Sequence, residues 1–356
     1  YYLVHDDPTG HLFAWSLLQA ADRGVRVRLL IDDMDTRGYD GMTAALDAHP
    51  NIGIRLFNPF RRDLGRALGA VTEFSRINRR MHNKSMTFDN VVTIVGGRII
   101  GAKYFAARED SNYDDLDLLG AGPIAREVSA SFDAYWNAPQ AVPARVVIGE
   151  CAGDVALEDG RARLAVLAEA ARRSEFGAAL SHGIAEAIAR GDLTLVWVPA
   201  RVVADPPEKA AGAEGGQTVS AVMAPYLRGA RQEIFVSSAC FVPRDRGVAL
   251  LSGLTARGVR VVILTKSLDS TDVEPVQGHY ARARRDMLEA GIELWELRPD
   301  QSRTNRAGIG LGQSQSGLHT KAFAIDGRHL FVGSFNWDPR SVWINTEMVS
   351  GSMRRR

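Results

Sequence analysis

An internal duplication constrains the fold of this chain more than any other feature of its sequence. The pentapeptide RGVRV at residues 23–27 recurs unchanged at 257–261, 234 residues later. GIRLF at 53–57 corresponds to GIELW at 291–295, and HNK at 82–84 corresponds to HTK at 319–321, with offsets of 238 and 237 residues. Landmarks in the same order at nearly constant spacing indicate two homologous halves, and so long a period excludes a solenoid. We therefore expect two similar lobes related by a pseudo-twofold axis.

The secondary-structure pattern is that of an α/β protein. Short β-branched runs alternate with segments of helical period, which predicts a largely parallel or mixed sheet covered by helices. We expect strands at 1–4 and 25–31 and helices at 12–21 and 123–136, with Gly24 ending the first helix. A stretch rich in Pro and Gly at 205–217 is expected to be an exposed surface loop.

The halves are expected to join near residues 138–143, where Ala and Pro follow the helix at 123–136. This gives an N-terminal lobe at 1–143 and a C-terminal lobe at 144–356. The sequence has no initiating Met and begins in an expected strand, so we expect the N-terminal lobe to be truncated and the chain to be a fragment.

Composition excludes several classes of protein. The 356 residues are 46% hydrophobic and 24% charged, which is typical of a globular chain. The 43 basic and 42 acidic residues give a net charge of +1, so affinity for phosphate must come from local clusters. Cys151 and Cys240 offer neither a disulfide framework nor zinc-ligand spacing, and we interpret both as buried apolar residues. No run of 18 apolar residues occurs, and no metal or cofactor is expected.

Each half carries one copy of the pattern His-x-Lys-x-x-x-x-Asp. The residues are His82, Lys84 and Asp89 in the first half, and His319, Lys321 and Asp326 in the second. The intervening residues are strand-like, so each His and Lys should share one face of a strand. One such match has a chance probability of about 1 in 10,000 per position. Two matches at corresponding places indicate a functional pair.

Two histidines and two lysines that converge across a twofold axis would suit a phosphodiester. Lysines would neutralise the non-bridging oxygens and the charge that grows on them in the transition state. One imidazole could attack phosphorus while the other protonates the leaving alkoxide and then deprotonates the incoming water or alcohol. A His pKa of about 6.5 serves both tasks near neutral pH.

The paired motifs resemble the signature of the phospholipase D superfamily, and the surrounding sequence is similar to its bacterial cardiolipin synthase branch. The supporting stretches are RRMHNKS at 79–85, TIVGGR at 93–98, SLDSTDV at 267–273, VGSFNWDPRS at 332–341 and NTEM at 345–348. The resemblance implies two phospholipase D-like α/β/α sandwich lobes with the active site at their interface. It also implies transfer or hydrolysis through a covalent phosphohistidine without a metal.

The resemblance further implies roles for individual residues. A carboxylate later in the same half orients each reacting His, which points to Asp117 and Glu347, 35 and 28 residues after the histidines. By the same analogy Ser334 and Asn336 hold the phosphate. One departure is Ile99, which stands where the branch carries Asn.

The resemblance also assigns His82 as the nucleophile and His319 as the acid/base. Asp89 and Asp326 are expected to be structural, because each follows a strand and can tie down the turn.

A basic segment precedes the first motif, and its pattern has two interpretations. Its apolar residues recur at helical spacing among arginines, namely Leu64, Leu68, Val71, Phe74 and Ile77 among Arg61, Arg62, Arg66, Arg76, Arg79 and Arg80. An amphipathic helix of this kind suits an anionic lipid surface. It equally suits packing of the apolar stripe on the lobe with solvated arginines.

Three catalytic functions and one non-catalytic function follow. The first is phosphatidyl transfer that makes cardiolipin from phosphatidylglycerol, with phosphatidylethanolamine as a second candidate lipid; the second is phospholipid hydrolysis to phosphatidic acid. The third is a nuclease, which would need a continuous basic groove with stacking aromatics, so the even charge balance weighs against nucleic acid. The fourth is a degenerate, non-catalytic member. The resemblance implies a bacterial protein peripheral to the inner membrane.

Overall fold

The computed structural model describes residues 1–34, 39–62, 73–108, 112–149, 153–180, 184–192, 195–213, 215–270, 274–298 and 316–353. Contacts within the chain define two compact units. Unit 1 comprises residues 1–77, 99–108 and 139–199, and unit 2 comprises residues 78–98, 109–138 and 200–356.

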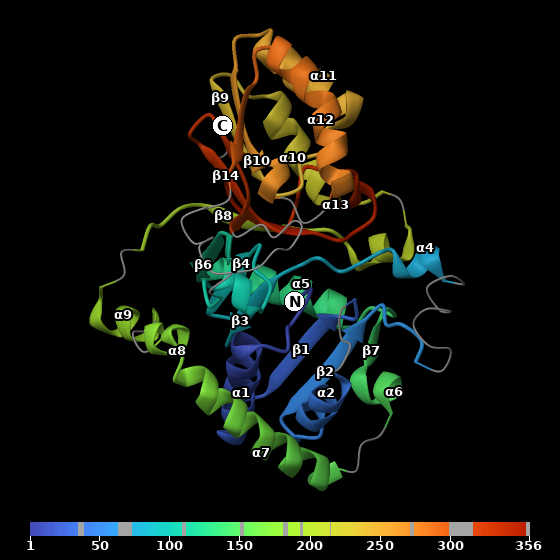
Figure 1. Cartoon of the computed structure of the whole chain (residues 1–356), viewed down its shortest axis with the longest axis vertical. Coiled ribbons are helices and arrows are strands. Elements are labelled where there is room, and N and C mark those ends of the chain that lie inside the picture. The colour runs from blue at the N-terminus through green and yellow to red at the C-terminus, as the bar shows by residue number, and fades with distance from the viewer. Residues whose placement is uncertain are drawn as a thin grey trace, which may run out of the picture. The chain divides into compact units, whose positions relative to one another are not determined.

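Unit 1 is built on parallel strands β1 (Val27–Asp32) and β2 (Ile52–Phe57), with β7 (Ala141–Pro143) antiparallel to β2. Its helices are α1 (Pro8–Asp22), α2 (Asp40–Asp47), α4 (Phe74–Ile77), η1 (Ala102–Tyr104), α6 (Ala144–Ile148), α7 (Gly153–Arg172), α8 (Glu175–Ala179) and α9 (Ile184–Arg190). Helix α7 packs along α1 and α2 (Figure 1). The apolar side chains of α1, α2 and the two parallel strands form one core.

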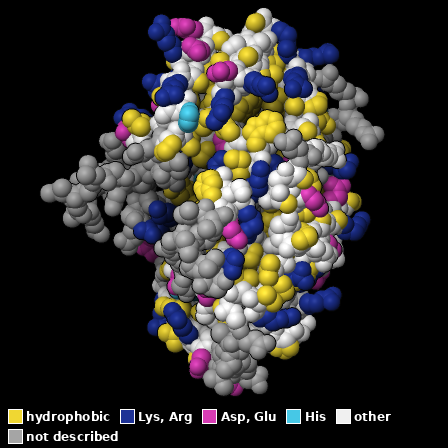
Figure 2. All heavy atoms as spheres, turned by 90° about the vertical axis from the view of Figure 1, so that its right-hand side faces the viewer, with side chains coloured by type: hydrophobic (Ala, Val, Ile, Leu, Met, Phe, Trp, Pro, Cys, Tyr) yellow, Lys and Arg dark blue, Asp and Glu magenta, His cyan; other side chains and the backbone are white. Residues whose placement is uncertain are grey.

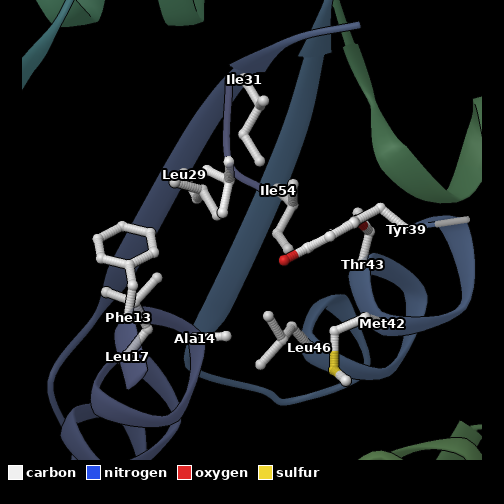
Figure 3. Close-up of a pocket in the computed structure, with 11 residues that line it drawn as sticks. Phe13, Ala14, Leu17, Leu29, Ile31, Tyr39, Met42, Thr43, Leu46 and Ile54 are labelled. Carbon is white, nitrogen blue, oxygen red and sulfur yellow. The ribbon is translucent and has the colours of Figure 1, made fainter. Parts of the chain in front are cut away.

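The sequence explains how α1 begins and ends. The Asp7 carboxylate accepts hydrogen bonds from the amides of Thr9 and Gly10, both at 3.0 Å, and Pro8 occupies the first helical position. Gly24 follows the helix with a φ of 88°, in the left-handed region that favours glycine. The expected helix and strand are therefore confirmed as α1 and β1. A small apolar cavity lies among α1, α2, β1 and β2 (Figure 3), and its aliphatic and aromatic lining offers no cluster of reactive groups.

Unit 2 contains a mixed sheet in the order β11-β10-β9-β13-β14-β15-β8. Strands β9, β10 and β11 run parallel to one another. The pairs β9–β13, β13–β14, β14–β15 and β15–β8 are antiparallel. The bounds are β8 (Ala200–Ala204), β9 (Glu233–Ser238), β10 (Arg260–Lys266), β11 (Glu293–Leu297), β13 (Lys321–Ile325), β14 (His329–Gly333) and β15 (Met348–Met353). Helices α10 (Val219–Arg228), α11 (Arg244–Thr255) and α12 (Glu274–Glu289) pack on this sheet around a core rich in aromatic and aliphatic residues (Figure 1).

A smaller antiparallel sheet in the order β3-β4-β6 contacts β14 and β15. Its strands are β3 (Ser85–Phe88), β4 (Val92–Gly96) and β6 (Asp117–Ala121), and α5 (Pro123–Trp136) packs on it and on β8. A short pair joins β5 (Asn112–Asp114) to β12 (Ser316–Leu318). The remaining elements are η2 (Pro207–Ala211), η3 (Leu268–Ser270) and α13 (Pro339–Trp343).

The duplication is visible in the strand order. Strand β4 pairs antiparallel with β3 and β6, just as β14 pairs with β13 and β15. The parallel pair β1–β2 likewise corresponds to β10–β11. The expected mixed α/β architecture with a repeated topology is confirmed. The boundary between halves at residue 143 stays a prediction, because units defined by contacts follow packing and not homology.

Several expectations require correction. Residues 1–4 form only an isolated bridge, between Val4 and Ile100, instead of a strand. The stretch at 205–217 is not a plain exposed loop, because Asp205 and Lys209 are 1% and 5% exposed. Cys240 is partly exposed and not buried as expected, and Cys151 lies outside the described residues.

The basic amphipathic segment is described only in part. Leu64, Leu68 and Val71 lie outside the described residues. In α4 the side chain of Phe74 is 65% exposed and that of Ile77 is 6% exposed, so these two residues do not share a buried face.

Candidate active site

Both motif histidines lie in unit 2, each just before a strand. His82 precedes β3, and its amide donates to the carbonyl oxygen of Thr346 at 2.9 Å. His319 precedes β13, and its amide donates to the carbonyl oxygen of Asp114 at 2.8 Å. The motif histidines were expected within strands; they instead occupy short connecting segments, which residues from the other half of the sequence hold in place.

Each histidine is paired with a buried carboxylate from the other half. His82 Nδ1 lies 2.9 Å from Oε2 of Glu347, and His319 Nδ1 lies 2.5 Å from Oδ2 of Asp115. Both carboxylate side chains are 0% exposed, whereas the His82 and His319 side chains are 12% and 15% exposed. A carboxylate at Nδ1 fixes the ring tautomer and leaves Nε2 for a substrate. The site is therefore shared by the two repeats.

The expected pairing of the carboxylates is wrong in two respects. Glu347 was expected to orient the His of its own half, but it contacts His82. Asp117 was expected beside His82, but its carboxylate forms an ion pair with Arg98 Nε at 2.8 Å. The nearby residue that contacts a motif histidine is Asp115.

Strand register explains why Asp115 takes this position. Gly96 at the end of β4 pairs with Asp117, and Gly333 at the end of β14 pairs with Val349. Two residues before these partners lie Asp115 and Glu347, so the two carboxylates are equivalent by register. Residues two apart along a strand share a face, so Asp117, the expected carboxylate, lies two residues from the one that contacts a histidine.

Two serines hold the Glu347 carboxylate. Ser334 Oγ donates to Oε2 at 2.5 Å, and Ser341 Oγ donates to Oε1 at 2.8 Å. Ser334, expected to hold phosphate, is 0% exposed and serves Glu347 in this structure. Asn336 Oδ1 accepts from the amide of Cys240 at 3.2 Å, and its side chain is 7% exposed.

The two motif lysines are almost fully buried, with exposed fractions of 1% for Lys84 and 2% for Lys321. Lys84 Nζ donates to the carbonyl oxygen of His82 at 2.7 Å. Lys321 Nζ donates to the carbonyl oxygen of His319 and lies 2.9 Å from its Nδ1. Buried ammonium groups are costly unless anions or strong acceptors compensate them, so this arrangement favours an anionic ligand.

The electrostatics couple the two motifs. Burial lowers the pKa of His82, and Lys84 and Lys321 lower it further while Glu347 opposes them. Burial also lowers the pKa of His319, well below its ordinary value, and Lys321, Lys84, Lys266 and His82 add to that effect. Burial alone would raise the pKa of Glu347, but its pairing with His82, the charge of Lys84 and the hydrogen bond from Ser334 outweigh burial, so its pKa lies below the ordinary value.

Other residues near His319 were not singled out from the sequence as site residues. The ring of Tyr113 lies 5.7 Å from the His319 ring between centroids, and Lys266 Nζ lies 5.0 Å from the Tyr113 centroid. Lys266 ends β10, at the carboxyl end of a parallel strand, where ligands commonly bind in α/β proteins. The position of Lys266 at the end of this strand was a sequence signal that could have identified this lysine as a site residue.

The motif aspartates lie at turns. Asp326 has a φ of 53°, and its carboxylate accepts from the amides of Arg231, Gln232 and Glu233 at 2.8 to 3.1 Å. It therefore ties the β13–β14 turn to the start of β9. Asp89 occupies the corresponding β3–β4 turn with a φ of 51°. Ile99, where the branch carries Asn, is 4% exposed.

The described ranges contain neither a candidate metal site nor a candidate membrane span. No group of three or more His, Cys, Asp or Glu side chains there could hold a metal ion. None of the helices described combines the length and the apolar composition needed to cross a bilayer.

Comparison with known proteins identifies the family. The family described as "Cardiolipin synthase, PLD-like domain" matches residues 1–136 and 223–351. Cardiolipin synthase C of Escherichia coli is 42% identical over 98% of this chain and 74% of its own length. An uncharacterised Helicobacter pylori protein is 31% identical over 97% of this chain and 69% of its own length.

A solved structure supports the fold independently. Phosphatidylserine synthase of Haemophilus influenzae superposes with a TM-score of 0.60 at 14% identity, over 98% of this chain and 75% of that one. At this identity the likeness shows the fold alone. The family match and the relative at 42% identity show that the chain belongs to the cardiolipin synthase branch of the phospholipase D superfamily.

Proposed function

We propose that this chain is a phosphatidyltransferase of cardiolipin synthase type that acts on phospholipid phosphodiesters through a covalent phosphohistidine. The observation that carries the proposal is the crossed pairing of His82 with Glu347 and of His319 with Asp115, beside two buried lysines. Membership of the cardiolipin synthase family supports it.

The first step forms the covalent intermediate. Glu347 accepts a hydrogen bond from Nδ1–H of His82, which keeps that proton on Nδ1, so the lone pair on Nε2 attacks phosphorus. The bond from phosphorus to the leaving alkoxide breaks, and that oxygen takes a proton from His319. Lys84 and Lys321 neutralise the non-bridging oxygens as charge builds on them.

The second step reverses these roles. The hydroxyl of phosphatidylglycerol gives its proton to His319, and its oxygen bonds to phosphorus while the bond to His82 breaks. The product is cardiolipin, and the leaving group of the first step is glycerol or ethanolamine according to the donor lipid. If water replaces the alcohol, the same intermediate yields phosphatidic acid.

Two arguments bear on which ring attacks. The family resemblance assigns attack to His82. Burial and the neighbouring lysines lower the pKa of His319 well below its ordinary value, which favours an unprotonated ring there, the state that a nucleophile requires. Quenching with denaturant at neutral pH during turnover preserves the acid-labile phosphorus–nitrogen bond, and peptide mass spectrometry would then locate the phosphatidyl group on one ring or the other.

The proposed setting is the surface of a bacterial inner membrane, to which the chain would bind peripherally. Its proposed substrate, phosphatidylglycerol, is a lipid of such a bilayer, and phosphatidylethanolamine is the second candidate donor. On the face shown in Figure 2, Lys and Arg side chains of the described residues are scattered among apolar and acidic ones. That distribution gives no support to the nuclease alternative, which needs a continuous basic groove.

The test is incubation of the purified protein with phosphatidylglycerol vesicles, with and without phosphatidylethanolamine, followed by lipid mass spectrometry. We expect cardiolipin from the wild type, none from His82→Ala or His319→Ala, and unchanged yield from His279→Ala, which alters an exposed histidine on α12. Phosphatidic acid alone would identify a hydrolase. No product from folded protein, with cleavage of single-stranded DNA, would identify a nuclease; no reaction on either would identify a non-catalytic member.

A further inference from the structure

A buried ion pair lies behind the His82–Glu347 pair. Lys209 Nζ lies 2.6 Å from Oδ2 of Asp205, and the two side chains are 6% and 0% exposed. Asp205 directly follows β8, and Lys209 lies in η2. Neither residue falls within the ranges 1–136 and 223–351 that match the family.

Asp205 brackets the backbone of Glu347 from both sides. Its amide donates to the carbonyl oxygen of Glu347 at 2.9 Å, and its Oδ2 accepts from the amide of Glu347 at 3.0 Å. Its other carboxylate oxygen accepts from the amide of Val219, the first residue of α10, at 2.7 Å. The backbone that carries the Glu347 carboxylate is thus fixed at both of its polar groups.

Lys209 reaches the same carboxylate by a second route. Its Nζ donates to the carbonyl oxygen of Ser341 at 2.9 Å, and Ser341 Oγ donates to Oε1 of Glu347 at 2.8 Å. Asp205 therefore holds the backbone of Glu347. Lys209 holds Ser341, whose hydroxyl orients the Glu347 side chain.

Stability alone does not account for such a pair. Removing two charges from water is costly, and apolar residues of similar volume often stabilise a fold as well. Here each charged group makes further hydrogen bonds that converge on one functional carboxylate. Groups behind a reacting residue commonly set its orientation in this way.

We propose that Asp205 and Lys209 are positioning residues that fix Glu347 and, through it, the His82 ring. This inference rests on the proposed function for its consequence in turnover. It does not extend to His319, because Asp115 is held differently: its backbone oxygen accepts from Arg98 at 2.9 Å, and its carboxylate accepts from the amide of Leu116 at 2.9 Å.

The test compares Asp205→Asn and Lys209→Met with Lys209→Arg and with Leu254→Ala. In Asp205→Asn the amide NH2 faces at least one other donor whichever way the amide is turned, either the amide of Val219 or the two donors of Lys209 and Glu347. Lys209→Met removes the bridge at similar length. Lys209→Arg retains donors for both partners. Leu254→Ala truncates a fully buried side chain of α11 that has no polar role. It serves as the control for a loss of melting temperature comparable to that of the test variants.

Two readouts are needed: kcat and KM on phosphatidylglycerol vesicles, and the 15N chemical shifts of the His82 and His319 rings. We expect kcat to fall about tenfold or more in Asp205→Asn and Lys209→Met, with KM little changed. The His82 signals should shift while those of His319 stay, and Lys209→Arg should recover much of kcat.

A kcat that falls no further than in Leu254→Ala, with unchanged His82 signals, would overturn the proposal. So would equal shifts at both histidines, which indicate a general loosening of unit 2. If the wild type makes no cardiolipin, the proposed function fails, and the ring signals alone still decide whether the pair positions His82.

Discussion

At the residue scale, the two buried carboxylates matter because each fixes which nitrogen of a histidine remains available. Replacing Glu347 by Gln, or Asp115 by Asn, keeps the shape but removes the charge that holds the proton on Nδ1. We expect turnover to fall on the order of 10²- to 10⁴-fold, as when the orienting carboxylate of a catalytic histidine is neutralised. Cardiolipin formation measured by mass spectrometry checks this.

Asp117→Asn is the matched control for that prediction. Asp117 lies two residues from Asp115 and contacts Arg98 instead of a histidine. We expect a smaller loss than for Asp115→Asn. The reverse order would restore Asp117 as the orienting residue that the resemblance implied.

The pH dependence follows from the lowered pKa values of the two rings. Burial lowers the pKa of both His82 and His319, so in the free enzyme each loses its proton below the ordinary value of about 6.5. A general acid must be protonated, so kcat/KM should fall as pH rises through that lowered pKa. A bound phosphodiester adds negative charge and raises both values, so the basic limb of kcat should lie at higher pH.

Profiles of kcat and kcat/KM against pH test this separation. A basic limb of kcat/KM at or above pH 7 would contradict it, as would coincident basic limbs for the two parameters.

The sequence singled out the paired motif residues but not the groups around them. His82, Lys84, His319 and Lys321 carry a repeated motif, and repetition is a signal that one sequence contains. Asp115 was missed because spacing places three aspartates within four residues, and only strand register separates them. The role of Ser334 depends on a hydrogen bond to Glu347, which no sequence pattern specifies.

At the element scale, the end of β4 leaves no room for a side chain. A Cβ built at Gly97 would lie 2.3 Å from Oδ1 of Asp115. We expect Gly97→Ala to displace that carboxylate from His319 and to lower kcat by at least tenfold, while the thermal stability changes less than in a core truncation. Turnover and the His319 ring signals provide the measurement.

Gly253→Ala is the control, because a Cβ at this exposed helical position meets nothing within 4 Å. It should raise stability by up to about 1 kcal/mol and leave kcat unchanged. Equal kcat values in the two alanine variants would show that the close approach at Gly97 is unimportant.

Elements with strong local signals were predicted well, and those that depend on distant partners were not. Gly24 and the periodicity of 12–21 identify α1, and Pro123 begins α5 where expected. Residues 205–217 were expected to form a loop because two prolines and three glycines stand among them. Asp205 and Lys209 are nevertheless buried there, because they also bond to Glu347 and Ser341, which lie more than 130 residues later in the chain.

At the scale of the whole molecule, homology and packing divide the chain differently. The repeats predict halves at 1–143 and 144–356, whereas contacts assign residues 78–98 and 109–138 to the same unit as 200–356. Both His–carboxylate pairs join the two repeats within that one unit. A duplicated chain can thus place one site on paired motifs, which explains why one half alone provides neither complete pair.

The two units have separate hydrophobic cores, so a truncation in one core should destabilise mainly that unit. Leu56 and Phe331 are both 0% exposed, in the cores of unit 1 and unit 2 respectively. Truncation to Ala should cost about 3 kcal/mol in each case through lost burial and a cavity. Hydrogen exchange should rise in β1, β2 and α1 for Leu56→Ala, and in β13, β14 and β15 for Phe331→Ala. Because the paired histidines belong to unit 2, only Phe331→Ala should also disturb their ring signals. Equal exchange in both units for either variant would show instead that the two cores unfold as a single cooperative structure.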